Sequence, residues 1–373
     1  MNAVTKLSSP EPETINSRPR ASGHLSHTTQ ALGDVLARGD AQWPTTTGPG
    51  AIFQSYDWWQ TWWDVASAQA QRSARAIVVE VGNRGVIVPI TSALERGPPQ
   101  LTWADNDFGC PDFRTLGTAT MARIVATELA SQSRFRLLFD NLRQRSAQHV
   151  AEALGQLGWV ASVEQSHLAP SIPLEESFDA YLLARFSGKS RSQLRRRLRD
   201  ANKNGNHIID HHVDGSIAEG MAHLVRLHGK RWENGGVFGD PTVLRFHTLL
   251  TQRLAQRGQL RLSTLVMDGK PIAAYYGYAD GDTAAFYQSG RDTKSDSSGG
   301  SVLIAHAIRS AIDDGCTRFD LLRGAETYKA RWKPDPTTTW RVRAYAPGVR
   351  GKLSQGAVVA KELARQLLKR ARK

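Results

Sequence analysis

Three apolar runs separated by two-residue turns constrain the fold of this chain most strongly. The runs Gln259–Met267, Pro271–Ala279 and Thr283–Ser289 are separated by Asp268–Gly269 and Asp280–Gly281. Asp-Gly pairs readily adopt the positive backbone angles that tight hairpin turns require. The sequence therefore predicts a meander of three antiparallel strands in the second half of the chain.

Helical and strand-like patterns alternate on both sides of this meander. Each half of the chain shows the same rough order of helix, hairpin strands, helix, strand, helix and strand, which suggests a duplicated module. We therefore predict an α/β (α+β) fold of two tandem domains, each a mixed, largely antiparallel sheet flanked by helices. The expected segments are a disordered leader (1–48), a first domain (50–168), a second domain (171–347) and a basic amphipathic helix (350–373).

Composition narrows the class of protein. The chain of 373 residues has no run of eighteen apolar residues, so no segment is predicted to span a membrane. Its cysteines, Cys110 and Cys316, lie far apart, which fits a reducing compartment and excludes a disulfide framework. The net charge of +13 favours a polyanionic partner, namely cofactor phosphates, nucleic acid or anionic lipid. We expect a cytoplasmic protein, with peripheral association at the inner membrane face as a further option.

A strand, a Ser- and Gly-rich loop and a helix follow one another after the meander. The unpaired N–H groups and partial positive charge of a helix N-terminus attract phosphate, and glycine lets a ligand approach the backbone. The pattern predicts a pyrophosphate-binding site, although a capped helix after a polar loop would look the same. Neither a P-loop nor a dinucleotide fingerprint is present. The predicted cofactor-binding residues are Gln288, Ser289, Gly290, Arg291, Ser298, Gly299, Gly300 and Ser301.

Titratable residues gather at the end of the next apolar strand. Such groups can remove a proton from one reactant, stabilise a developing negative charge and protonate a leaving group. Asp320 or Glu326 is a candidate base, and Tyr328 is a candidate acid. Arg323 and Lys329 would orient groups or neutralise charge. A structural Asp–Arg pair with packed aromatic residues would explain the same pattern.

Several of these positions resemble GNAT-type acyltransferases of the CelD/BcsL-like family associated with cellulose biosynthesis. The matching motifs are Tyr-Gln-Ser-Gly at 287–290, Phe-Asp-Leu-Leu-Arg-Gly at 319–324, and Glu326 with Tyr328-Lys329 and Arg331-Trp332. This chain departs from the family at Gly299, where a proline is usual. The tandem architecture is also similar to that of Fem-type transferases, which use aminoacyl-tRNA.

The resemblance implies two GNAT-like modules, the first of them degenerate, with acetyl-CoA or another acyl-CoA bound by the second. It also implies an acceptor amino or hydroxyl group on a sugar, a polysaccharide precursor or a related glycan. We expect the acceptor to contact Trp232, Phe238 and Trp332, together with Arg195 and Arg199 of the basic helix.

The basic helix from Ser190 to Lys203 keeps two alternatives open. It could contact tRNA, as in a Fem-like transferase, or another polyanion without any enzymatic activity. A membrane surface is a further anionic partner for the basic helices. A solvated charged face would look the same. His207, His211 and His212 do not form a convincing cluster of ligands, so no metal site is predicted.

Overall fold

A computed structural model describes residues 25–93, 99–105, 108–109, 111–230, 233–292 and 298–371. Its first half contains β1 (Leu25–Ala31), α1 (Leu32–Leu36), η1 (Asp40–Gln42), η2 (Ala51–Gln54), α2 (Tyr56–Val65), α3 (Ala68–Ser73), β2 (Arg75–Val81), β3 (Arg84–Ala93), β4 (Gln100–Trp103), α4 (Ala119–Gln132), β5 (Arg136–Leu142), α5 (Gln144–Gln156) and β6 (Val160–Leu168).

The second half begins directly after this strand. It contains β7 (Ser171–Pro173), α6 (Phe178–Arg185), α7 (Gly188–Asp200), β8 (His207–Asp210), α8 (His211–Asp214), α9 (Ile217–Gly229), η3 (Glu233–Gly239), α10 (Pro241–Gln256), β9 (Leu260–Met267), β10 (Lys270–Asp280), β11 (Thr283–Arg291), α11 (Gly299–Asp313), β12 (Arg318–Asp320), α12 (Thr327–Ala330), β13 (Thr338–Tyr345) and α13 (Val349–Ala371).

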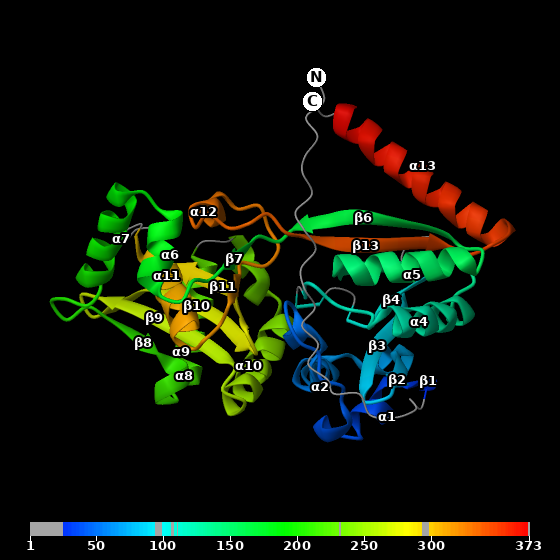
Figure 1. The fold of residues 1–373 in the computed structure, drawn as a ribbon, viewed down its shortest axis with the longest axis horizontal. Helices are drawn as coiled ribbons and strands as arrows, with labels where there is room; N and C mark the ends of the chain where they lie inside the picture. The colour runs from blue at the N-terminus through cyan, green and yellow to red at the C-terminus, as the bar shows by residue number, and fades with distance from the viewer. Residues whose placement is uncertain are drawn as a thin grey trace.

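Within the described residues, the strands form two mixed sheets that lie side by side, each flanked by helices (Figure 1). The first sheet has the order β1-β2-β3-β4-β5-β13-β6, and the second has the order β7-β12-β11-β10-β9-β8. Only β4–β5 and β11–β12 pair in parallel among these strands. The predicted fold class is confirmed.

The predicted meander is present as β9, β10 and β11, with antiparallel pairing throughout. Asp268 and Gly269 both have positive φ angles, 49° and 70°, as their turn requires. Gly281 also has a positive φ of 57°. Local sequence therefore determined this part of the fold.

Strand β13 crosses from the second half of the chain into the first sheet. The sequence assigned residues 171–347 to the second domain, but β13 lies between β5 and β6 and pairs with both. Val342 and Ala344 of this strand are fully buried in the first domain's core. The sequence did not predict this assignment of β13, because strand pairing between distant segments leaves no signal in local periodicity.

The prediction that residues 1–48 form a disordered leader is wrong from residue 25 onward. The structure places β1 and α1 within it, and β1 pairs along its whole length with β2. Leu32, Val35 and Leu36 of α1 are buried in an apolar cluster, so this segment has a packing face despite its polar composition. Residues 1–24 lie outside the described residues.

A single apolar cluster contains residues from both halves of the chain. Trp58 of α2 packs edge-on against Phe246 of α10, with ring centroids 4.9 Å apart. Phe53 makes a similar contact with Tyr278 of β10 at 5.7 Å. At its rim, Arg257 forms an ion pair with Asp57 at 2.6 Å. The two sheets are therefore joined by core packing as well as by the chain.

We predict that the two domains unfold together. Phe139 belongs to the first domain's own core and Phe246 to the shared cluster, and both are fully buried. Phe139→Ala and Phe246→Ala should each cost about 3–5 kcal/mol and shift one common denaturation transition, followed by tryptophan fluorescence and far-UV circular dichroism. Two separate transitions, each moved by only one variant, would contradict a shared core.

Candidate functional site

Strands β11 and β12 run in parallel but soon separate. They pair only between Thr283–Ala285 and Arg318–Asp320, while β11 continues to Arg291 along β10. The chain after Asp320 turns away instead, and the Leu321 N–H donates to the carbonyl of Pro170 at 3.0 Å. Beyond Ala285, β11 therefore has no strand partner on this side within the described residues. Such a strand edge can pair with amide groups of an elongated ligand.

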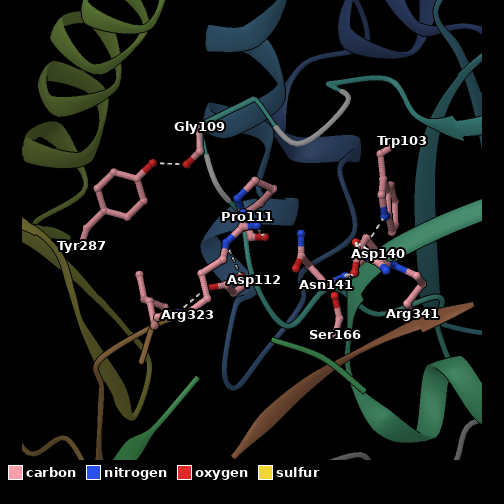
Figure 2. Close-up of polar contacts among 12 residues, drawn as sticks. Trp103, Gly109, Pro111, Asp112, Asp140, Asn141, Ser166, Tyr287, Arg323 and Arg341 are labelled. Atoms are coloured by element: carbon pink, nitrogen blue, oxygen red, sulfur yellow. Dashed lines mark hydrogen bonds and ion pairs between the residues drawn. The ribbon is translucent and has the colours of Figure 1, made fainter. Parts of the chain in front are cut away.

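Tyr287 lies at a bulge in β11 and connects the two domains. The pairing with β10 shifts from Tyr276↔Gln288 to Gly277↔Phe286, which leaves Tyr287 as the extra residue. Its hydroxyl donates to the carbonyl of Gly109 in the first domain (Figure 2). The bulge thus turns a side chain of β11 toward the neighbouring domain.

His247 of α10 lies against this tyrosine and is completely buried. Its Nε2 is 3.3 Å from the Tyr287 hydroxyl. Burial lowers the pKa of His247 from 6.5 to about 3, so the imidazole is neutral near pH 7.

An ion pair between Asp112 and Arg323 also joins the domains at the separated strand ends. The Arg323 Nε lies 3.0 Å from the Asp112 carboxylate, and the Arg323 backbone N–H donates to it at 2.8 Å. Asp112 is fully buried, and Figure 2 shows the two side chains directed at one another. Arg323, predicted as an orienting residue, thus positions a loop of the first domain against the end of β12.

Lys329 holds the segment that follows β12. Its ammonium donates to the carbonyls of Leu322 and Arg323 at 3.1 and 2.8 Å, and pairs with Glu326 at 3.0 Å. Burial lowers the pKa of Lys329, although Glu326, Asp112 and Asp320 act in the opposite direction. These contacts make Lys329 a positioning group.

Asp320 lies at the end of β12 and is almost completely buried. It lines a small cavity of about 10 Å³ between the domains, together with Tyr278, Thr283 and Leu322 of the second half and Gly48, Gly50, Ala51 and Ile52 of the first. The Tyr278 hydroxyl is buried and has no hydrogen-bond partner within the described residues. Burial, with further contributions from Tyr287, Asp112 and Asp320, raises its pKa well above 10, so it keeps its proton. A polar ligand group entering this cavity would find a donor beside a carboxylate.

The two other predicted catalytic residues lie beside the same segment. Tyr328 is half-buried, with its ring 6.4 Å from that of Phe286 on β11. The Glu326 side chain is partly exposed and folds over Gly324. The sequence-predicted catalytic residues therefore all lie at or directly after the end of β12.

Two arginines lie near the N-terminus of α11. Arg291 lies over Gly300, with its Cδ atom 3.8 Å from where a Cβ atom would stand. Arg331 donates to the Ser301 hydroxyl at 3.3 Å. Ser298 makes no side-chain cap, so its hydroxyl does not occupy the first-turn N–H groups. The arrangement suits an anion, although residues 293–297 of the loop lie outside the described residues.

The remaining predicted cofactor-binding residues lie along the end of β11. Gln288 and Ser289 are half-buried, and the Ser289 carbonyl contacts His228 Nδ1 at 2.9 Å. Gly290 packs directly on α9, since a Cβ atom there would lie 2.3 Å from the backbone nitrogen of His228. This glycine serves close packing of strand and helix.

The predicted acceptor-contacting residues do not gather in one place. Phe238 is buried against His228, with ring centroids 5.0 Å apart, and Trp332 is buried against Phe186. Arg195 and Arg199 are exposed on α7, where Arg195 pairs with Asp179 at 2.7 Å. Trp232 lies outside the described residues.

The histidines near β8 have partners within the protein. His211 contacts the hydroxyls of Ser216 and Thr264 at 2.6 and 2.9 Å. Within the described residues, no three His, Cys, Asp or Glu side chains are placed to share a metal ion.

Sequence reasoning missed Asp112, Tyr278 and Arg331 as site residues. Asp112 reaches the site from the first domain, so no spacing in the sequence could place it there. Tyr278 lies near the end of an apolar strand and resembles an ordinary core residue. Arg331 was noted within a motif, but its contact with Ser301 depends on folding.

The corresponding gap in the first domain is filled by the chain itself. Strands β4 and β5 also pair in parallel for only two residues, but Arg114 then lies beside the end of β5. Its guanidinium pairs with Asp105 at 3.0 Å and lies 4.6 Å above the ring of Trp103. A buried, paired arginine in this position leaves no space for a ligand.

Asp140 closes the neighbouring end of the same gap, where Trp103 donates to its backbone carbonyl at 3.1 Å. Its carboxylate accepts from Ser166 of β6 and from Arg341 of β13, as Figure 2 shows. Burial alone would raise the pKa of Asp140, but the bonds from Arg341 and Ser166 outweigh it and lower the pKa.

Comparison with known protein families finds one similarity in the second half of the chain. Residues 188–330 match the family model described as an acetyltransferase (GNAT) domain. The matched segment contains the separated strands, the N-terminus of α11 and every residue predicted for catalysis or cofactor binding. This segment is therefore similar in sequence to acetyltransferase (GNAT) domains. No protein with a curated description matches the chain in sequence.

Comparison with solved structures supports the fold over most of the chain. FemX superimposes with a TM-score of 0.58 at 12% identity, covering 82% of this chain and 95% of its own. A conserved protein of unknown function from Bacteroides thetaiotaomicron gives 0.49 at 13% identity, covering 83% and 97%. A tandem GNAT protein from the clavulanic acid biosynthesis pathway gives 0.42 at 12% identity, covering 87% and 100%. The likeness to FemX shows that the tandem fold is shared.

We predict that His247 makes stability depend on pH. The unfolded chain binds a proton below about pH 6.5, while the folded protein does so only near pH 3. Stability should therefore fall as the pH decreases through this window, by about 1 kcal/mol per pH unit from this residue. His247→Phe should reduce that slope in urea denaturation, whereas the exposed His207→Phe should keep it. Equal slopes in both variants would contradict a neutral buried imidazole.

Proposed function

We propose that this chain transfers an acyl group, with acetyl the simplest case, from acyl-CoA bound beside β11. The observation that carries the proposal is the separation of β11 from β12 directly before a cation-flanked helix N-terminus. An acyl-CoA has an elongated arm with amide groups, which suits an unpartnered strand edge, and a pyrophosphate, which suits the start of α11. Arg291 and Arg331 would hold the phosphate charge there.

The proposed chemistry uses residues at the end of β12. Asp320 would accept the proton of the acceptor's amino or hydroxyl group as the new bond to the acyl carbon forms. The carbon–sulfur bond then breaks, and Tyr328 would donate its proton to the departing thiolate. Arg323 and Lys329 would fix the surrounding loop, with Glu326 as the counter-ion of Lys329. The buried Tyr278 hydroxyl could hydrogen-bond a polar acceptor group in the cavity.

The acceptor that we propose is a sugar, a polysaccharide precursor or a related glycan. Support for this class comes from the resemblance of residues 287–290 and 319–324 to the CelD/BcsL-like family. The cavity between the domains is consistent with a small polar group entering beside Asp320. Acetylation of amino sugars and their nucleotide derivatives, followed by mass spectrometry, would test this choice.

We predict that Gly300→Asp separates binding from stability. The site has space for a side chain, and a carboxylate in the first turn favours the helix. The same charge would repel a pyrophosphate, so affinity for acetyl-CoA in calorimetric titration should fall at least about tenfold. Gly300→Asn, which adds the same bulk without charge, should bind far better. Equal affinity in wild type and both variants would place the phosphates elsewhere.

We predict that Asp320→Asn lowers kcat by roughly 10²–10⁴-fold while acetyl-CoA affinity is unchanged. The variant keeps the volume of the buried side chain and removes its capacity to accept a proton. Thiol release and thermal denaturation should be measured on the same preparations. A loss of folding that parallels the loss of turnover would assign Asp320 a structural role.

A second candidate function follows from the exposed cations of α7. Arg195, Arg196, Arg199 and Lys203 all face solvent on this helix or just after it. They could bind an aminoacyl-tRNA donor in place of acyl-CoA. Transfer from charged tRNA by a preparation that fails to bind acetyl-CoA would favour this candidate. Salt-sensitive RNA binding without any transfer would indicate a polyanion-binding protein instead.

A further inference from the structure

Over residues 349–360, whose burial the structure describes, the C-terminal helix α13 contacts the rest of the protein through one side. Gly351 and Ser354 are buried, and a Cβ atom at Gly351 would clash with the Ala346 carbonyl. The helix follows β13 and then diverges from the first sheet along its length (Figure 1). Its other side therefore faces away from both domains.

This outward side is apolar. Val349 and Leu353 are 72% and 68% exposed, and Ala360 is also exposed. These positions share one face at 100° per residue, and the sequence continues the same spacing with Leu363 and Leu367. Large apolar side chains rarely line one exposed helix face unless another surface covers them.

Cations border this apolar strip on both sides. At helical spacing, Arg350 falls on one flank and Lys352 on the other. The segment Val349–Ala371 contains six Lys and Arg residues and one acidic residue, Glu362. Any surface that covers the strip must therefore also accommodate strong positive charge.

Two further exposed apolar residues lie near the start of the helix. Val160 of the edge strand β6 is 59% exposed and pairs in register with Tyr345, four residues before α13. Leu157, in the preceding turn, is 43% exposed. In the part of the chain that the structure describes, no helix has the length and apolar composition needed to cross a bilayer.

We propose that α13 binds the surface of an anionic lipid bilayer and lies in its plane. The apolar strip would enter the boundary between headgroups and acyl chains, and the flanking Lys and Arg residues would contact lipid phosphates. Charge complementarity selects this partner over a neutral protein surface. The inference does not depend on the identity of the acyl donor.

Sedimentation of the full chain with phospholipid vesicles tests this proposal. Vesicles containing phosphatidylglycerol should retain the protein about tenfold more strongly than pure phosphatidylcholine, and added salt should weaken the binding. Leu353→Asp should reduce the binding by roughly tenfold or more. Leu183→Asp is the matched control, because Leu183 is 67% exposed and belongs to α6, a helix that lies far from α13 in Figure 1.

Three results would overturn the proposal. The wild-type chain could fail to sediment with anionic vesicles, or both leucine variants could lose binding equally. Light scattering could instead reveal a concentration-dependent dimer that Leu353→Asp dissociates, in which case a second copy of the chain covers the strip. Thermal denaturation of both variants should match the wild type, since both leucines are exposed.

Discussion

Trp58 of α2 packs against Phe246 of α10, and this contact lies in an apolar cluster common to both domains. The candidate site depends on this packing, because its parts come from both sides of the interface. Asp112 of the first domain fixes Arg323, and Gly109 accepts a hydrogen bond from Tyr287. A loose connection between the domains would leave buried charges without partners, at a cost of several kcal/mol. Packing in the shared core therefore holds the parts of the candidate site together.

The two domains use the same strand arrangement for different purposes. In each of them, two parallel strands pair briefly and then separate. The first domain fills its gap with Arg114, which is held by Asp105 and Trp103, and closes it with Asp140. In the second domain, the gap precedes a helix N-terminus flanked by Arg291 and Arg331. One domain thus provides structural support and the other provides the proposed donor site.

Sequence alone predicted the features that local chemistry determines. The Asp-Gly turns identified the meander, and the clustering of Asp320, Glu326 and Tyr328 after an apolar strand predicted the region of the candidate site. The sequence did not predict the contacts between segments that lie far apart in the chain. Strand β13 pairs with β5 and β6, which lie far from it in the sequence, and Asp112 reaches Arg323 across the domain interface. Burial of Trp332 and Phe238 was also missed, because an aromatic residue suits a core and a ligand contact equally well.

Hydrogen–deuterium exchange of the full chain, with and without acetyl-CoA, tests the central claim most directly. The account predicts slower exchange at the end of β11 and in the first turn of α11, with no change at the filled gap between β4 and β5. Protection at β4 and β5, or no protection anywhere at saturating acetyl-CoA, would contradict a single donor site in the second domain.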